Sequence, residues 1–439
     1  MRILLTLTLM FVVSACGSNT LATIPPTVPP ATTMPVSATP LPTNTPLPTN
    51  TPLPTNTPQA QPIPTEQLAD LAATSIAELP ATSTPDANGL ADYPGISTVQ
   101  VRPLTGPGGG LAVVFTSGFR RFEPEQSHYV SIYSRDEQGW RELSRVELGE
   151  PDYIDPASVQ QVPITPDRVW LTIDGGVGAH GSCFNLLSFD NPQLTSIIES
   201  CSSAPGAGNV GDIDGDGITE VLLNGTDYYV TCYACGLRVF HTTVLRWDGN
   251  EFKQLQLTEL PSDTELAKLN NEVVMLAKSN RWREARLPLP KLRSLAKGDP
   301  IVLTNAGLIE IDGRSFADQA ANTALAPLMP SIFYGDYEAT LAYLREKPVA
   351  DLFEVERSQI FGPEVQGFEA NMPKYITAAI EPALLLDPTL APARFLKGWA
   401  LILADPTDRQ GLAEIEQAAQ LEPKEPLYAA CAAYLKARG

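Results

Sequence analysis

One short stretch, GDIDGDGITEVLL, carries the clearest chemistry of the sequence. Carboxylates stand at alternate positions, Asp212, Asp214 and Asp216, with a glycine after the second and after the third. Alternation around a tight turn directs the three carboxylates inward. Gly215 and Gly217 permit the left-handed backbone angles that such a turn needs. The spacing therefore predicts a cage of oxygen atoms.

Two further residues complete the predicted ligand set. Ile218 can offer its backbone carbonyl and Glu220 a carboxylate, and Ca²⁺ prefers oxygen ligands in this number. An EF-hand would end in a bidentate glutamate at its twelfth position, where this chain has Leu223. The loop runs straight into a predicted strand, and in this it resembles the calcium loops of FG-GAP and VCBS-type propeller blades. That resemblance implies a structural calcium ion held by Asp212, Asp214, Asp216, Ile218 and Glu220. The alternative is an acidic, solvated turn without an ion.

A catalytic metal would instead need an open position beside a base or a nucleophile. The three histidines, His128, His180 and His241, stand in no HExxH motif. The sequence contains neither a GxSxG elbow nor a phosphate loop ending in GK[ST]. We therefore expect a protein that is not an enzyme. A hydrolase that combines the acidic loop with His180 or His241 is the least favoured alternative.

Two cysteines belong to one predicted hairpin. A register that pairs Asp190 with Leu194 across the turn also places Cys183 opposite Cys201. Residues that face each other in an antiparallel ladder come close to disulfide spacing. We expect a bond between these two cysteines.

Two more cysteines form a CxxC motif, Cys232 and Cys235. In thioredoxin-like proteins this motif opens a helix, but the residues around it here indicate strand and turn. Zinc would need a second CxxC. A local disulfide is the preferred interpretation, and crossed bonds with Cys183 and Cys201 are the alternative. Cys431 lies in a helical pattern and is expected to be a buried, unpaired thiol.

Residues 91–260 show short alternating runs split by Gly, Pro and Asp, which predicts many short strands. Three hairpins stand out, with turns near Gln138, Pro192 and Gly249, at intervals of 54 and 57 residues. Another strand candidate precedes each of them. A repeat of roughly 55 residues and four strands is typical of a propeller blade, but propellers usually have at least four blades. We expect a propeller-like, all-β region that is incomplete, with about three four-stranded units.

The hydrophobic period then changes to 3.6, which predicts helices. Near the C-terminus, Ala383 and Pro388 recur as Ala418 and Pro423, 35 residues later. This spacing resembles the tetratricopeptide repeat, a helix-turn-helix unit in which small residues let paired helices approach closely. Pro382 departs from that pattern and is expected to kink its helix. An irregular helical bundle is the alternative.

The chain opens MRILLTLTLMFVVSACGSN, with Arg2 before an apolar run too short for a permanent membrane span. This predicts a signal peptide over residues 1–15. The segment ending in Cys16 resembles the lipobox of bacterial lipoproteins, which implies a lipidated cysteine and a membrane anchor outside the cytoplasm. An ordinary signal peptide is the alternative.

Residues 16–90 are rich in proline and threonine and include three copies of PLPTNT, which predicts an extended, disordered tether. Within it, residues 65–79 place four apolar residues on one helical stripe: Leu68, Leu71, Ile76 and Leu79. This helix either docks on the following domain or forms only transiently.

The whole chain is thus predicted to be a multidomain α+β protein, with the β region followed by a TPR-like, all-α region over 261–439. With 50 acidic and 30 basic residues its formal charge is −20, which argues against nucleic acid as a partner. We expect an extracytoplasmic, lipid-anchored scaffold that binds a protein partner through its helical repeats. A carbohydrate or solute receptor is the alternative. Its stacking residues would be Trp140, Trp170, Tyr228, Tyr229 and Trp247, although aromatic residues at these positions are more often strand core.

Overall fold

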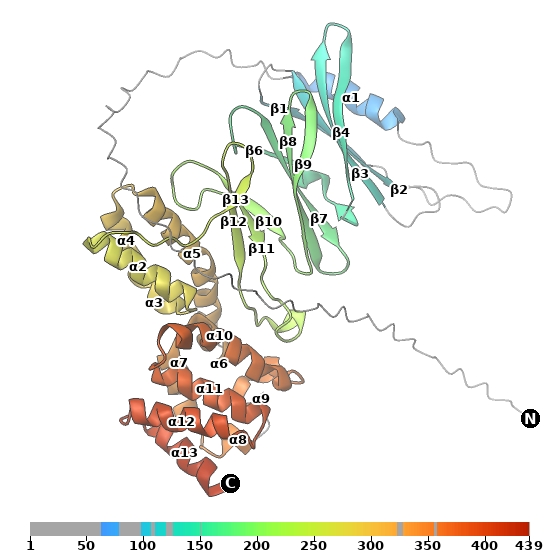
Figure 1. Cartoon of the computed structure of the whole chain (residues 1–439). Coiled ribbons are helices and arrows are strands. Elements are labelled where there is room, and N and C mark those ends of the chain that lie inside the picture. Colours follow the sequence, from blue (N-terminus) through green and yellow to red (C-terminus); the bar gives the residue numbers. More distant parts are fainter. Residues whose placement is uncertain are drawn as a thin grey trace, which may run out of the picture. The chain divides into compact units, whose positions relative to one another are not determined.

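The computed structural model describes residues 63–78, 98–106, 110–119, 126–149, 151–322, 328–354 and 358–438, which all belong to one compact unit, 58–439. The predicted signal peptide, the lipid site at Cys16 and the PLPTNT repeats lie outside these residues. The described chain has one N-terminal helix, then a region of antiparallel sheets, then a region made only of helices (Figure 1).

The β region contains three sheets in which the strands follow chain order. The first sheet contains β1 (Thr98–Leu104), β2 (Leu111–Phe119), β3 (Gln126–Asp136) and β4 (Gly139–Leu148). In the second, β5 (Tyr153–Ile154) and β6 (Gln160–Val162) both pair with β7 (Val169–Val177), which is followed by β8 (Gly181–Asp190) and β9 (Gln193–Ser202). The third contains β10 (Gly208–Gly211), β11 (Glu220–Asn224), β12 (Thr242–Trp247) and β13 (Phe252–Gln254).

The three predicted hairpins are formed by β3–β4, β8–β9 and β12–β13. The strand candidates that precede them are β2, β7 and β11. All three sheets are open, and the strands that the structure describes form no closed ring.

The second sheet is covered on both faces. Successive side chains of a strand point to opposite faces, so Val169, Leu171 and Ile173 of β7 share a core with the first sheet. Trp170, between them, packs with Phe252 and other residues of the third sheet. This explains why the first five residues of β7, 169–173, are all buried and mostly apolar instead of alternating.

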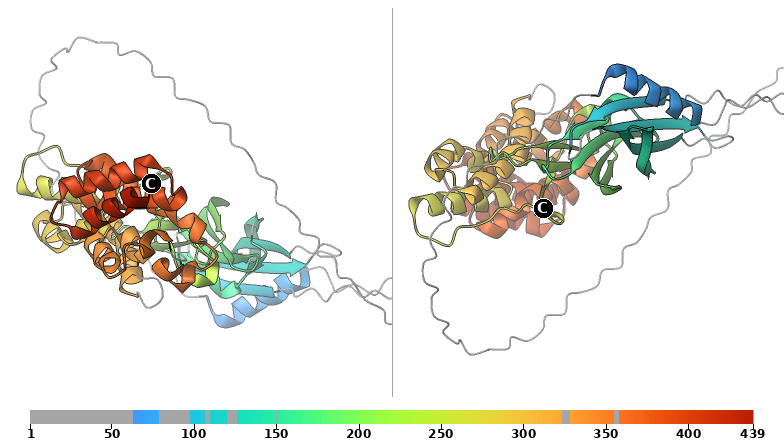
Figure 2. Two further views of the ribbon diagram at one scale, coloured as in Figure 1. Left: turned by 90° about the horizontal axis from the view of Figure 1, so that it is seen from below. Right: turned by 90° about the horizontal axis from the view of Figure 1, so that it is seen from above.

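The first sheet is covered on its other face by helix α1 (Thr65–Glu78). Leu71 is fully buried against Ala112 and Val114 of β2, and the indole N–H of Trp140 donates to the Gln67 carbonyl at 3.0 Å. Both views of Figure 2 show α1 lying along this sheet. Of the two possibilities for this segment, the docked helix is the one observed.

The second hairpin differs from its predicted register near the turn. Asp190 pairs with Gln193 instead of Leu194, because the turn contains only Asn191 and Pro192, which a cis peptide bond joins.

Farther along this hairpin the predicted register is restored. A bulge between Leu186 and Leu187 shifts the pairing by one residue, so that Cys183 lies opposite Cys201 as expected. The sulfur atoms of these cysteines lie 1.96 Å apart, and those of Cys232 and Cys235 lie 2.08 Å apart, so both pairs are local and uncrossed.

The helical region begins with a group packed around a long helix. Its members are α2 (Glu265–Lys278), α3 (Trp282–Arg286), α4 (Leu289–Ala296), α5 (Pro300–Ala321), α6 (Leu328–Tyr334), α7 (Tyr337–Arg345), α8 (Asp351–Glu354) and α9 (Ser358–Phe361). Thr264, Asp299 and Asp336 cap three of these helices by accepting a backbone N–H of the first turn. The longest, α5, has 22 residues and forms hydrogen bonds with β12 and with the segments that precede β11 and β12.

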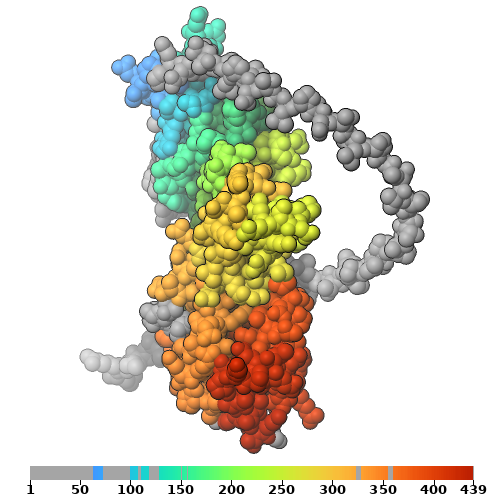
Figure 3. Space-filling model, turned by 90° about the vertical axis from the view of Figure 1, so that its left-hand side faces the viewer, coloured from blue at the N-terminus to red at the C-terminus, as the bar shows by residue number. Residues whose placement is uncertain are grey.

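The last four helices are α10 (Met372–Leu386), α11 (Ala391–Ala404), α12 (Arg409–Leu421) and α13 (Pro426–Arg438). Each packs on the next, and together they form a continuous surface, drawn in orange to red in Figure 3. A Cβ atom added to Gly398 would lie 2.5 Å from the Gly411 carbonyl oxygen, so only glycine permits this close approach of α11 and α12. Helix α10 continues through Pro382 to Leu386.

The remaining cysteine, Cys431, is buried and unpaired as expected, and burial raises the pKa of its thiol to about 12. Among the described residues we find no helix with the length and apolar character needed to cross a bilayer.

Candidate metal centre

The acidic loop connects β10 to β11, two short strands that pair with Gly211 opposite Glu220. Gly215 and Gly217 have φ values of +79° and +84°, which is the left-handed conformation predicted for them. No other atom lies within 4 Å of a Cβ built at either position, so their backbone angles, not crowding, favour glycine.

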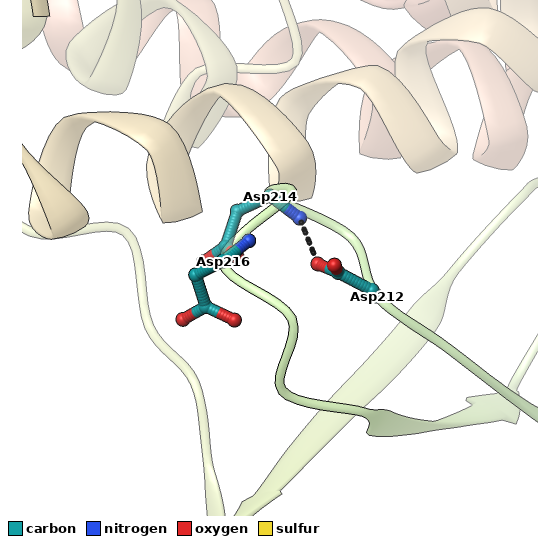
Figure 4. A group of neighbouring side chains, drawn as sticks. All are labelled: Asp212, Asp214 and Asp216. Carbon is teal, nitrogen blue, oxygen red and sulfur yellow. Dashed lines mark hydrogen bonds between the residues drawn. The ribbon is translucent and has the colours of Figure 1, made fainter. Parts of the chain in front are cut away.

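The carboxylates of the three aspartates accept hydrogen bonds from backbone amides of the same turn. Asp212 accepts from the amides of Gly215 at 2.7 Å and Gly217 at 2.9 Å, and also from that of Asp214 (Figure 4). Asp214 and Asp216 each accept the amide two residues ahead. The Gly217 amide and the other loop amides hold the pKa of the Asp212 carboxyl below its ordinary value, because they stabilise its charged form.

One carboxylate oxygen from each aspartate lies within 4.8 Å of the other two, so Asp212, Asp214 and Asp216 could together hold a metal ion. Ile218, the next predicted ligand, lies at the exposed end of the loop. Glu220 is fully buried and is not part of the three-carboxylate group. Its carboxylate accepts the Ile213 amide at 3.0 Å, and burial raises its pKa above the ordinary value.

A cation of the chain itself already binds this cluster. The Arg246 guanidinium lies 2.8 Å from Asp214, 3.1 Å from Asp216 and 2.6 Å from Glu220. The Asp214 and Glu220 side chains are fully buried, so this pairing offsets much of the cost of burying them. One guanidinium against four carboxylates still leaves the site with an excess of negative charge.

The cluster also joins the third sheet to helix α5. The Thr304 hydroxyl donates to Asp214 at 2.6 Å. Three residues along α5, a Cβ atom at Gly307 would lie 2.5 Å from the Ile213 carbonyl oxygen, so glycine lets the loop rest directly on the helix. The loop therefore contributes to packing between the two regions of the protein.

Sequence reasoning missed Arg246 and Thr304. For Arg246 a signal existed, because the register in which Val221 pairs with Leu245 extends to Glu220 and Arg246, an opposite-charge pair across two strands. For Thr304, ninety residues from its partner Asp214, no local pattern could have shown the contact.

The three histidines considered as possible catalytic groups lie outside the acidic loop. His180 stacks on Tyr233, His241 lies beside Asp312, and His128 is buried in the first sheet. In the part of the chain that the structure describes, no hydrogen bond or ion pair joins a histidine to the acidic loop.

The aromatic residues considered for carbohydrate stacking are mostly core. Trp170 is fully buried, Trp247 packs on it, and Trp140 donates a hydrogen bond to α1. Tyr228 lies under the Arg238 guanidinium, 4.5 Å from it, whereas Tyr229 is 47% exposed.

Comparison with known proteins found no match. No family model matches the chain, and no curated protein or solved structure matches it.

The cluster leads to a prediction about stability. Arg246→Met keeps the apolar stem but leaves Asp214 and Glu220 buried without a counter-charge, so we expect the free energy of unfolding to fall by about 3–5 kcal/mol. Urea denaturation followed by circular dichroism measures this loss. Arg314→Met is the matched control, because Arg314 is 71% exposed and should change the free energy by less than about 0.5 kcal/mol. Equal effects of the two substitutions would show that the cluster does not stabilise the fold.

Proposed function

We propose that this protein is a non-catalytic scaffold that is lipid-anchored outside the cytoplasm and binds another protein through its helical region. The lipobox-like sequence ending in Cys16 supports the anchor. The proline- and threonine-rich segment after it supports a spacer between the membrane and the folded part.

The main support for a binding role is the stacked series of helices α10–α13. Each helix in the series packs on the next, which is how repeat proteins build extended binding surfaces. Ala383 and Ala418, 35 residues apart, are both fully buried, which supports two TPR-like helix pairs. In the same proposal the three open sheets are blade-like units of an incomplete propeller.

A specific patch on this series suits a protein partner. Leu385 of α10 is 80% exposed, and beside it lies a hollow of about 180 Å³ that Ile380 and Leu384 also line. Arg394 and Lys397 border the hollow, and both are paired with Glu414. An apolar anchor within a rim of paired charges has the composition of a binding hot spot.

Calcium is the ion we propose for the acidic loop. All the donors that the three aspartates offer are oxygens, and hard cations of this kind prefer such donors. Since Arg246 leaves part of the negative charge unbalanced, the loop can still gain from a divalent cation. The ion would be structural, because it would brace the turn that rests on α5.

We predict that calcium raises the melting temperature and that Asp212→Asn reduces this rise. Asp212 forms no ion pair with Arg246, so its substitution replaces a charged ion ligand by a neutral amide oxygen without breaking the arginine cluster. A ligand bound only by the native state adds about 2.7 kcal/mol at a hundredfold excess over its Kd. Melting curves in chelator and in millimolar Ca²⁺ measure the effect.

The control for this experiment is Asp248→Asn. Asp248 likewise accepts two backbone amides in a β-turn but does not belong to the three-carboxylate group. This variant should keep the full calcium response. If wild-type protein melts at the same temperature in both buffers, the calcium proposal is wrong.

For the protein partner we predict a site-specific cross-link. A photoreactive amino acid at position 385, in protein expressed in its native cell envelope, should yield one discrete adduct with a second protein. The same amino acid at position 420, an exposed site on α12, should not. Immunoblotting after irradiation reads the result. Equal labelling at both positions, or none at either, would refute a docking site at Leu385.

A further inference from the structure

A pocket of about 520 Å³ lies where the third sheet meets the helical region. Its walls come from the segments around β12 and β13 and from helices α2, α3, α5, α6 and α10. This volume is in the range of pockets that hold small organic molecules, which also favour junctions between structural regions.

Aromatic side chains form much of its wall. Phe316 of α5 meets Phe240 edge-on, with ring centroids 5.2 Å apart, and stacks on Trp282 at 5.7 Å. Phe333 and Tyr375 form a second edge-on pair on the α6 and α10 side. Such walls offer an apolar surface, and their ring faces attract cations.

Two carboxylates also line the pocket, and both accept hydrogen bonds from neutral groups. Asp312 is only 8% exposed, and its carboxylate accepts the Thr242 amide at 3.2 Å. Asp227 accepts the Tyr375 hydroxyl at 2.8 Å and the Tyr229 amide. Among the residues that the structure describes, no lysine, arginine or histidine forms an ion pair with Asp312.

A buried carboxylate without a cation is unusual, because buried charges are normally paired. Burial raises the pKa of the Asp312 carboxyl, and the Thr242 hydrogen bonds and the nearby His241 only oppose that rise. Lys278 also borders the pocket, but it is about half exposed and its ammonium group lies 3.5 Å from Glu259. Asp312 is therefore a carboxylate on the pocket wall that forms no ion pair with any described residue, and a cation bound in the pocket would favour its charged form.

We propose that this pocket binds a small organic ammonium compound, with its charge at Asp312 and its apolar substituents against Phe240, Phe316 and Trp282. This inference is separate from the scaffold function proposed above, because the pocket shares no lining residue with the acidic loop or with the hollow beside Leu385, although α10 contributes to both. It assigns the pocket a ligand class that is cationic, partly apolar and small.

The test uses choline as the probe and its neutral analogue, in which a carbon replaces the quaternary nitrogen. Saturation-transfer NMR with the whole folded protein compares their affinities up to tens of millimolar. We expect choline to bind and the analogue to bind at least about tenfold more weakly, since only the charge differs. Equal binding of the two compounds, or no binding of choline, would overturn the proposal. This comparison needs no variant.

A pair of isosteric substitutions then locates the charge. Asp312→Asn keeps an acceptor for the Thr242 amide but removes the negative charge, so choline affinity should fall about tenfold. Asp318→Asn is the matched control, because Asp318 is on the same helix, is 76% exposed and does not line the pocket. A loss of affinity in both variants or in neither would contradict the assignment of the ammonium group to Asp312.

Discussion

A single guanidinium, that of Arg246, neutralises buried carboxylates of the acidic loop where this loop rests on the helical region. It contacts Asp214 and Glu220, two carboxylates with no exposed side-chain surface, and it also pairs with Asp216. Burying such charges is costly unless each has partners, so the loop, β12 and the cluster must form together. The Thr304 hydroxyl extends the network to α5. Farther along that helix, Asp312 accepts the amide of Thr242 in β12, and Gln319 accepts the amide of Arg238 in the segment before β12.

The β region is ordered by a second constraint, the alternation of side chains along a strand. In β2 and β7 both sets of alternate residues are buried, so each of these strands needs cover on both faces. The first sheet therefore packs between α1 and the second sheet, and the second sheet between the first and the third. The third sheet is shorter, and its loops instead meet the helices. The proposed ammonium pocket lies at this last junction, where sheet and helices leave a space lined by aromatic rings.

Much of this architecture could be predicted from the sequence, because it depends on residues that are close together in the chain. The turns near Gln138, Pro192 and Gly249 were recognisable because turn residues and strand periodicity act over a few positions. The glycine angles of the acidic loop were predictable for the same reason. The disulfide prediction was right although the turn register behind it was wrong, because the bulge at Leu186 compensates for the shorter turn. Contacts across long sequence separations, such as Asp214 with Thr304, depend on how sheets and helices pack, and no local pattern encodes them.

The most direct test of this account is a double-mutant cycle on the contact that joins loop and helix. Asp214→Ala and Thr304→Val, alone and combined, would be compared by their free energies of unfolding in urea. If the charge cluster joins the third sheet to α5, the effects of the two substitutions on the free energy of unfolding should be coupled by about 1 kcal/mol or more. Effects that add to within about 0.5 kcal/mol would mean that the two regions are held together without this contact.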